Sequence, residues 1–152
     1  MRTVKNILES KAKPDNVVPS STLVIEGLKK LISVNLSYLI VMDQGEYKGI
    51  FSERDYSRNI VLKGRASDST TVGEAMATDL PEVVLTDTVE NCMKLLTSNR
   101  VRYLVAFNAD HEFAGVITIH DLLRSVIANK EEIFDESVAH QLIDHDESGD
   151  IY

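Results

Sequence analysis

The sequence predicts an α+β fold made of two pseudo-symmetric β-α-β-β-α repeats that pack sheet to sheet. The first observation is an internal duplication: residues 49–55 (GIFSERD) and 115–121 (GVITIHD) both place a glycine, a hydroxyl residue and an aspartate at intervals of three. The aspartates that end the two segments are Asp55 and Asp121. The second observation is that similar apolar runs and amphipathic stretches precede both copies. A repeat of about 55 residues would leave one face of its three-stranded sheet bare, so we expect the two sheets to pack together.

The first repeat begins with a short helix, predicted for residues 1–12, and a short strand at 17–18. Apolar side chains recur at helical spacing over 23–32, which predicts a helix with one buried stripe. The nearly continuous apolar run at 38–42 is typical of a strand covered on both faces. These elements give the β-α-β part of the first repeat.

A hairpin and a second helix complete the first repeat. Residues 43–46 (DQGE) have the composition of a tight turn, and residues 47–51 predict the returning strand. Ser52 is placed to begin a helix that extends to about residue 62. We expect Gly64 to end that helix, because glycine readily adopts the left-handed conformation that follows a helix.

The second repeat follows a polar linker at 63–71 and a short helix at 71–76. Its predicted elements are a strand at 83–84, a helix at 89–98, a hairpin of strands at 103–107 and 113–117, and a helix at 118–129. The turn of this hairpin is one residue longer than the first. We therefore divide the chain into a first repeat with its N-terminal helix and linker at 1–71, a second repeat at 72–130 and an acidic tail at 131–152.

The charge of the chain is unevenly distributed. Its net charge is −8, and the segment from Glu131 onward contains eight acidic residues and no lysine or arginine. The rest of the chain is therefore close to neutral. An acidic tail repels a phosphate backbone and offers it no contacts, so we expect no nucleic acid polymer as a partner.

The lengths of the apolar runs indicate the cellular location to expect. They are only four or five residues long, so we expect no membrane span, and the first residues are not followed by an apolar signal core. Cys92 is the single cysteine, which excludes a disulfide within the chain and fits a small core residue. We therefore expect a cytoplasmic protein.

The two hairpins, each followed by Ser/Thr-x-x-Asp, resemble a pair of cystathionine-β-synthase (CBS) domains, the tandem arrangement called a Bateman module. The resemblance covers roughly residues 3–129, and the chain is similar to small stand-alone bacterial members. Four segments carry it: 49–55, 71–76 (TVGEAM), 99–104 (NRVRYL) and 115–121. Each segment alone is weak evidence, whereas their order and duplication make the set specific.

The resemblance implies that an adenosine-containing ligand binds between the repeats. AMP, ADP and ATP are the first candidates, with NAD and S-adenosylmethionine as alternatives. It also implies disc-shaped homodimers and a regulatory role toward an unidentified target protein. The first repeat has NLSY at 35–38, with no arginine matching Arg100 or Arg102. We therefore expect two unequal clefts and leave open whether one or both bind ligand.

The two aspartates are the central candidates for a ribose site. An ionised carboxylate has two acceptor oxygens, so Asp55 or Asp121 can accept hydrogen bonds from both hydroxyls of a ribose. Ser52 and Thr118 lie at predicted helix N-termini, where a hydroxyl and backbone N–H groups can meet a phosphate or ribose oxygen. The same spacing is that of a capping box, which stabilises a helix start by about 1 kcal/mol without any ligand. The two roles can coexist.

Basic and apolar candidates complete the expected nucleotide site. Arginine suits phosphate because its guanidinium can donate two parallel hydrogen bonds, although solvated surface charges are the alternative for the arginines on the first helix. His120 replaces Arg54 in the second repeat and is either a phosphate contact or a surface residue. The family resemblance places the adenine against the first and central strands, where the tyrosines could equally be core residues. The candidates for phosphate are Arg54, Arg58, Arg100, Arg102 and His120, and those for adenine are Val18, Tyr38, Val84 and Tyr103.

We therefore expect a regulatory, adenosyl-nucleotide-binding protein that senses energy or redox state. We expect no catalytic activity and no metal site, because no nucleophile–base pair and no cluster of metal ligands emerges from the sequence. The alternative is a structural homo-oligomerisation module whose ligand clefts are vestigial. Ligand-independent dimers would favour this second interpretation.

Overall fold

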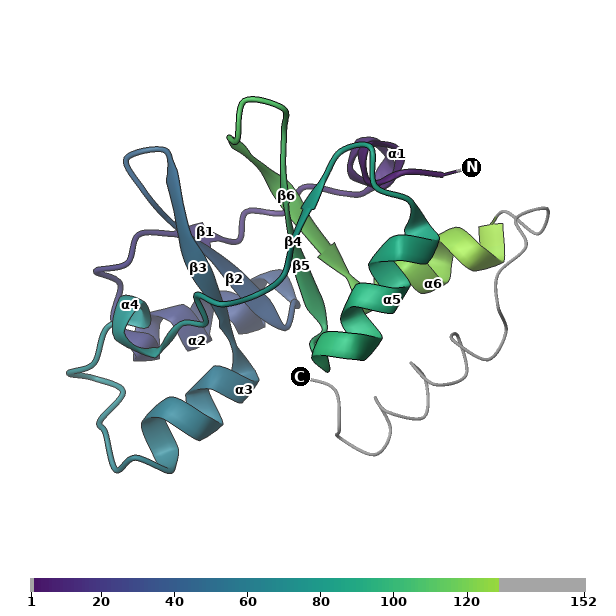
Figure 1. Ribbon diagram of the computed structural model, residues 1–152. Coiled ribbons are helices and arrows are strands. Elements are labelled where there is room, and N and C mark those ends of the chain that lie inside the picture. The colour runs from purple at the N-terminus through teal and green to yellow at the C-terminus, as the bar shows by residue number, and fades with distance from the viewer. Residues whose placement is uncertain (1, 129–152) are drawn as a thin grey trace. The chain divides into compact units, whose positions relative to one another are not determined.

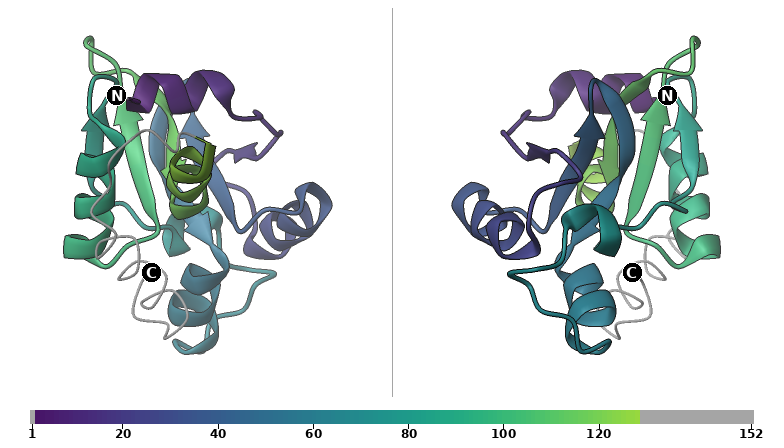
Figure 2. Two further views of the ribbon diagram at one scale, coloured as in Figure 1. Left: turned by 90° about the vertical axis from the view of Figure 1, so that its right-hand side faces the viewer. Right: turned by 90° about the vertical axis from the view of Figure 1, so that its left-hand side faces the viewer.

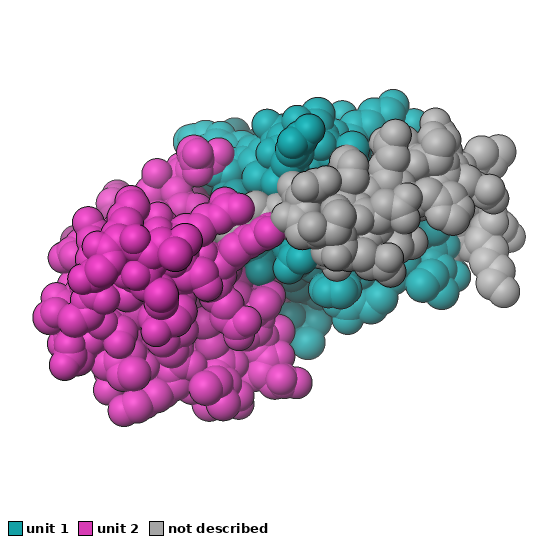
Figure 3. Space-filling model, turned by 90° about the horizontal axis from the view of Figure 1, so that it is seen from below, with its two compact units in different colours: residues 1–12, 80–152 teal, residues 13–79 magenta. Residues whose placement is uncertain are grey.

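The computed structural model describes residues 2–128, which form two compact units (Figure 1). Among the described residues, unit 1 contains 2–12 and 80–128, and unit 2 contains 13–79 (Figure 3). Each unit contains one three-stranded sheet with helices, which confirms the predicted mixed α+β fold. The acidic tail predicted for 131–152 lies outside the described residues.

The sheet of unit 2 consists of β1 (Val17–Val18), β2 (Tyr38–Asp43) and β3 (Glu46–Ser52), in that order. Strands β1 and β2 are parallel because α2 (Val24–Val34) crosses between them, and β2 and β3 form an antiparallel hairpin. The hairpin turn places Gln44 and Gly45 at φ values of 52° and 80°. Positive φ at both central residues matches the twist of a two-residue hairpin, as the turn composition predicted.

The helical segment after this hairpin spans nearly the predicted range, but only its first turn is α-helical. Helix α3 (Glu53–Tyr56) passes into a π-helical turn, η1 (Ser57–Val61), in which the Leu62 N–H donates to the Ser57 carbonyl at 3.0 Å. Asn59 in this turn donates through its side chain to the Ala75 carbonyl at 2.8 Å. This bond ties the wide turn to α4 (Val72–Ala75), so a tertiary contact accompanies the departure from α-helical geometry.

Unit 1 repeats the topology with β4 (Glu82–Val84), α5 (Val89–Asn99), β5 (Tyr103–Phe107), β6 (Phe113–Thr118) and α6 (Ile119–Ala128). Its strands are ordered β4-β5-β6, with a parallel and then an antiparallel pair. Helices α5 and α6 cover one face of the sheet (Figure 2). Buried side chains from both helices pack there against Leu104, Ala106 and Ile117.

The N-terminal helix, α1 (Val4–Ser10), packs on unit 1 rather than on the repeat that follows it in sequence. Val4 and Ile7 lie in the core of unit 1, and the Val4 N–H donates to the Asp87 carbonyl at 2.9 Å. In unit 2 the corresponding place is taken by α4, whose Val72 is fully buried. The compact units therefore do not coincide with the sequence ranges 1–71 and 72–130.

Each sheet carries apolar side chains on both faces. In unit 2, Leu39, Val41 and Phe51 pack into the core, and strand alternation places Tyr38 and Ile40 on the opposite face. In unit 1 that opposite face carries Tyr103, Val105 and Val116. The central strands β2 and β5 thus carry apolar side chains on both faces. None of the helices in residues 2–128 has the length and hydropathy of a transmembrane segment.

Candidate functional site

The Ser52-x-x-Asp55 motif of unit 2 forms the predicted capping box at the start of α3. The Ser52 N–H and hydroxyl donate to Asp55 Oδ2 at 2.8 and 2.9 Å, and the Asp55 N–H donates back to the Ser52 hydroxyl at 3.3 Å. Both residues are buried, with 3% and 4% exposure. The hairpin delivers Ser52 directly to the helix start, so the motif joins a strand end to a helix N-terminus.

The matching motif of unit 1 makes the same two backbone hydrogen bonds. The Thr118 N–H donates to Asp121 Oδ2 at 2.9 Å, and the Asp121 N–H donates to Thr118 Oγ1 at 3.2 Å. Asp121 is buried at the start of α6, with 5% exposure. The alternative helix-capping role is therefore present in both repeats.

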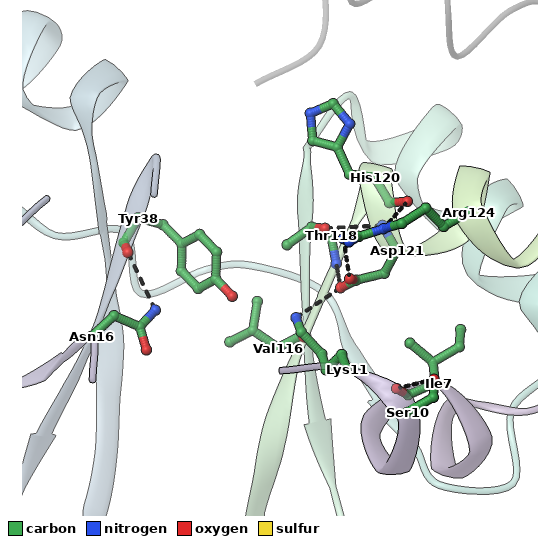
Figure 4. A network of polar contacts seen from close by, with 10 residues as sticks. All are labelled: Ile7, Ser10, Lys11, Asn16, Tyr38, Val116, Thr118, His120, Asp121 and Arg124. Carbon is green, nitrogen blue, oxygen red and sulfur yellow. Dashed lines mark hydrogen bonds and ion pairs between the residues drawn. The ribbon is translucent and has the colours of Figure 1, made fainter. Parts of the chain in front are cut away.

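Asp121 also forms two ion pairs with basic side chains (Figure 4). Lys11 Nζ lies 2.8 Å from Oδ2, and Arg124 Nη2 lies 3.1 Å from Oδ1. Only 2% of the Asp121 side chain is exposed, against 19% for Lys11 and 74% for Arg124. Both carboxylate oxygens thus face a cation in a largely dry environment, where charge-assisted hydrogen bonds are strong.

Lys11 is fixed by a second hydrogen bond. Its Nζ donates to the Val116 carbonyl at 2.9 Å, on the strand that leads to Thr118. Ile50 occupies the matching strand position in unit 2, where its carbonyl accepts instead from the Ala77 backbone N–H at 2.8 Å. In unit 1 a lysine side chain therefore takes the place that a backbone amide holds in unit 2.

A pocket of about 260 Å³ opens beside Asp121, between α1 and α6. Ile7 and Ala128 supply apolar parts of its wall. The N-terminal segment supplies Arg2, Ser10 and Lys11 to its polar lining. Helix α6 supplies Asp121, Arg124 and Ser125. Three basic side chains thus share one pocket with a single carboxylate.

The predicted tyrosines lie beside the two motifs. Tyr38 is paired with Ser52 across the first hairpin, and Tyr103 is paired with Thr118 across the second. The Tyr38 carbonyl accepts from the Asn16 side chain at 3.4 Å (Figure 4). Within each unit, the register therefore brings one tyrosine to the end of the strand that carries the hydroxyl residue.

The two valines expected at the adenine differ in environment. Val18 is buried in the core of unit 2, whereas Val84 is 48% exposed. Strand pairing shows the reason: Val18 pairs with Val41, and Val83 makes the matching pair with Ala106. The structural equivalent of Val18 is thus Val83. The second hairpin turn is one residue longer than the first. Equivalent strand residues before the turns are therefore one position closer together in the sequence than equivalent motif residues after the turns.

The predicted basic residues are spread over several elements. Arg54 lies on α3, and Arg58 is exposed on η1. Arg100 is the exposed, left-handed C-cap of α5, where φ is 54°. The Arg102 carbonyl accepts from the Ile119 N–H at 3.1 Å, which places this residue at the start of α6. His120 is exposed on the first turn of α6, and its carbonyl accepts from Arg124 Nε at 3.4 Å.

The pocket adds basic residues that the sequence did not single out. Arg124 carried a usable signal, because it follows Asp121 at the same spacing as Arg58 follows Asp55 and so occupies the same place in the duplicated motif. Arg2 and Lys11 carry no such signal, since they flank a helix whose packing on unit 1 is a tertiary property. Within residues 2–128, no group of three or more His, Cys, Asp or Glu side chains is arranged to hold a metal ion.

Comparison with known proteins identifies the duplicated unit. A family model for the CBS domain matches residues 4–62 and 72–128. The mitochondrial CBS domain-containing protein CBSX3 of Arabidopsis thaliana is 30% identical over 139 residues, covering 86% of this chain and 67% of the plant protein. The CBS domain-containing protein YhcV of Bacillus subtilis is 24% identical over 130 residues, covering 86% of this chain and 89% of that protein.

Solved structures agree with the family model. A protein with CBS domains from Burkholderia ambifaria is 32% identical, with a TM-score of 0.76 over 87% of this chain and 98% of that one. CBSX2, solved in complex with AMP, shares the fold at 24% identity, with a TM-score of 0.67 over 84% of this chain and 98% of its own. Because the family model matches both repeats, this protein belongs to the CBS domain family and carries two CBS domains in tandem.

Proposed function

We propose that this protein is a regulatory module that binds an adenosine-containing nucleotide and catalyses no reaction. One observation carries the proposal: Asp121 is a buried carboxylate at a helix start, and it lines a pocket rich in basic side chains. A carboxylate can accept both hydroxyls of a ribose, and basic side chains can meet the phosphate. The AMP complex of the structurally similar CBSX2 supports this class of ligand.

The second repeat is the better candidate for the ligand. Arg100, Arg102 and Arg124 all belong to this repeat, whereas the positions that match Arg100 and Arg102 in the first are Asn35 and Ser37. AMP, ADP and ATP are the first ligands to test, followed by NAD and S-adenosylmethionine. Binding would regulate a target only if the ligand prefers one conformation or assembly over another.

Replacing the aspartate tests the proposal. We expect Asp121→Ala to weaken AMP binding by at least about tenfold, because at least one charge-assisted hydrogen bond to the ribose is lost. Asp121→Asn is the safer variant, since its amide oxygen can still accept the Thr118 N–H while the negative charge is removed. Isothermal titration calorimetry measures both affinities, and circular dichroism verifies the fold.

Asp55→Asn is the matched control, because Asp55 has the same capping geometry in the other repeat. Its AMP affinity should stay near that of the wild type if unit 1 holds the ligand. An unchanged affinity in both Asp121 variants would remove Asp121 from the site. If none of the five ligands bound to the folded protein, nucleotide sensing would be rejected.

The proposal includes a cytoplasmic homodimer that acts on a target protein. Large apolar side chains are exposed on helices or at helix ends in both units, with Ile32 at 80%, Leu62 at 79% and Ile127 at 72%. Such side chains are suited to cover one another in a dimer. Light scattering gives the mass in solution, and a monomer at micromolar concentration would contradict the dimer.

The alternative is a structural module that assembles without a ligand. The capping boxes favour it, since both Asp55 and Asp121 already accept hydrogen bonds that stabilise helix starts. This function requires dimers whose mass and thermal stability do not change with nucleotide. Light scattering and thermal melting with and without AMP therefore distinguish the two functions.

A further inference from the structure

We propose that the acidic tail of this chain, residues 131–152, docks on an exposed basic and apolar surface of unit 2. This surface lies on η1 and on the chain that directly follows it. We call it the 58–65 surface and define it by the exposed residues Arg58, Val61, Leu62, Lys63 and Arg65. The inference goes beyond the proposed nucleotide binding and does not depend on it.

The 58–65 surface presents apolar side chains to water. Val61 is 54% exposed and Leu62 is 79% exposed, whereas the preceding Ile60 is buried in the core of unit 2. The Arg65 N–H donates to the Ile60 carbonyl at 2.9 Å, which holds the chain after the turn close to η1. Covering exposed apolar area is favourable, so a partner that contacts Val61 and Leu62 gains free energy.

Exposed cations flank these apolar side chains. Arg58, Lys63 and Arg65 supply three positive charges, and the first acidic residue that follows them in the sequence is Asp68. In the described part of the chain, neither Lys63 nor Arg65 forms an ion pair. The surface therefore has a local excess of positive charge, which attracts an acidic segment.

The acidic tail has the complementary chemistry. It contains eight acidic residues and no lysine or arginine, whereas the rest of the chain is close to neutral. Phe134, Val138 and Leu142 recur in it at intervals of four, among the acidic residues. This interval is typical of an apolar stripe flanked by charge. Such a stripe is suited to cover Val61 and Leu62 while carboxylates meet the cations around them.

The length of the chain after α6 is sufficient for the contact. At about 3.3 Å per residue, residues 129–152 can span about 80 Å, well beyond the roughly 30 Å diameter of a small domain. Because the tail is tethered to the surface that it contacts, its effective concentration there is on the order of millimolar. Exposed ion pairs are individually weak, so docking depends on several of them together with the apolar contact.

Docking would make the tail a reversible cover. Leu62 would be shielded by the tail, whereas Ile32 and Ile127 would remain exposed and available for a dimer. Ion pairs between exposed groups weaken as the ionic strength rises, because salt screens them. A target that needs the 58–65 surface would therefore have to displace the tail.

A spin label on the tail tests the contact in the full chain. Ser137→Cys supplies the attachment site, because the natural Cys92 is buried, and the wild-type chain put through the same labelling is the blank. We expect the nitroxide to weaken the amide NMR signals of residues 61–65 at least about twofold at about 0.01 M ionic strength, where the Debye length is about 30 Å. The signals should recover at about 1 M, where it is about 3 Å.

Two double variants with the same label separate specific docking from general attraction. Lys63→Gln with Arg65→Gln should restore the low-salt signals of residues 61, 62 and 64. Lys5→Gln with Lys94→Gln removes the same charge from exposed lysines of unit 1 and should leave those signals weakened. Unchanged chemical shifts away from the substitutions verify that both variants fold.

The outcomes that would contradict the inference are distinct. Full signals at residues 61–65 in the spin-labelled Ser137→Cys chain at low salt would overturn it, and so would equal weakening in the two double variants. Weakening in a mixed sample, in which the observed copy carries no nitroxide, would show docking between two copies and overturn docking within one chain. Because no nucleotide is present, a negative result leaves nucleotide binding untouched, and failure of nucleotide binding leaves this inference standing.

Discussion

In the proposed function, Asp121 serves both the fold and a ligand. Its two oxygens accept from the Thr118 N–H, from Lys11 and from Arg124. A carboxylate has about four acceptor positions, so a ribose with two hydroxyls must displace at least one of these donors. Arg124 is the donor to leave, because 74% of its side chain is exposed and water can solvate it. Lys11 is the donor to stay, because only 19% of its side chain is exposed and its Nζ has a second acceptor at Val116.

Cys92 offers a prediction at the same scale. Burial, and to a smaller degree the negative charge of Asp87, raises the pKa of the Cys92 thiol to about 12. Because the thiolate is the reactive form, we expect almost no reaction of the native protein with Ellman's reagent at about pH 8. Unfolding in urea should expose the thiol and release one equivalent of chromophore, measured by absorbance. Rapid reaction of the native protein would show that Cys92 is accessible.

At the scale of elements, helices α1 and α4 are the same motif used twice. Thr3 and Thr71 both cap their helices, and Val4 and Val72 are both fully buried. Helix α1 precedes the strands of the first repeat but packs on unit 1, which contains the strands of the second repeat. Helix α4 belongs by sequence to the second repeat but packs on unit 2, which contains the strands of the first. The consequence is that each compact unit needs chain from both sides of the repeat boundary, which couples folding of the two repeats.

The local spacing of apolar residues predicted most helices and strands. The features that it did not predict depend on contacts between residues that are distant in the sequence. The strand at 38–42 and the helix at 89–98 were recognisable because their apolar periods are regular over the whole element. The π-helical turn at Ser57–Val61 was not, because it is accompanied by a hydrogen bond from Asn59 to distant Ala75. Duplication predicted the hydrogen-bonded pair of Thr118 and Asp121, whereas Lys11 reaches Asp121 from the other end of the described chain and leaves no local pattern.

Gly49 gives a prediction for the contact between β3 and the segment after α4. A Cβ atom at Gly49 would lie 2.6 Å from the Ala77 carbonyl oxygen, which is itself bonded to the Ile50 N–H at 3.0 Å. We expect Gly49→Ala to lower the free energy of unfolding by about 1–3 kcal/mol, because backbone must move to relieve the overlap. Urea denaturation measures the change.

Lys48→Ala is the neighbouring control. Lys48 forms an exposed ion pair with Glu46 at 3.2 Å, so its loss should cost less than about 1 kcal/mol. Equal unfolding midpoints for the two variants would show that the close approach of Gly49 to Ala77 carries no stability.

At the scale of the whole molecule, the apolar second faces of the two sheets need to be covered. Tyr38 and Ile40 on one sheet, and Tyr103 and Val105 on the other, lie on the faces opposite the helical cores. Leaving an apolar sheet face in water forgoes the free energy that its burial would gain. Sheet-to-sheet packing of the two repeats, which the sequence led us to expect, remains a prediction and would cover both faces at once.

Val105→Lys tests this packing, because Val105 is at the centre of β5 on the face away from the core of unit 1. If the sheets pack together, the lysine charge is buried without a partner, and the free energy of unfolding should fall by about 2 kcal/mol or more. Val84→Lys is the control, since Val84 is 48% exposed on the neighbouring strand and its replacement should change stability little. Urea denaturation compares the two variants. If Val105→Lys is as stable as Val84→Lys, this face of the unit 1 sheet is open to water, and the expected sheet-to-sheet packing is rejected.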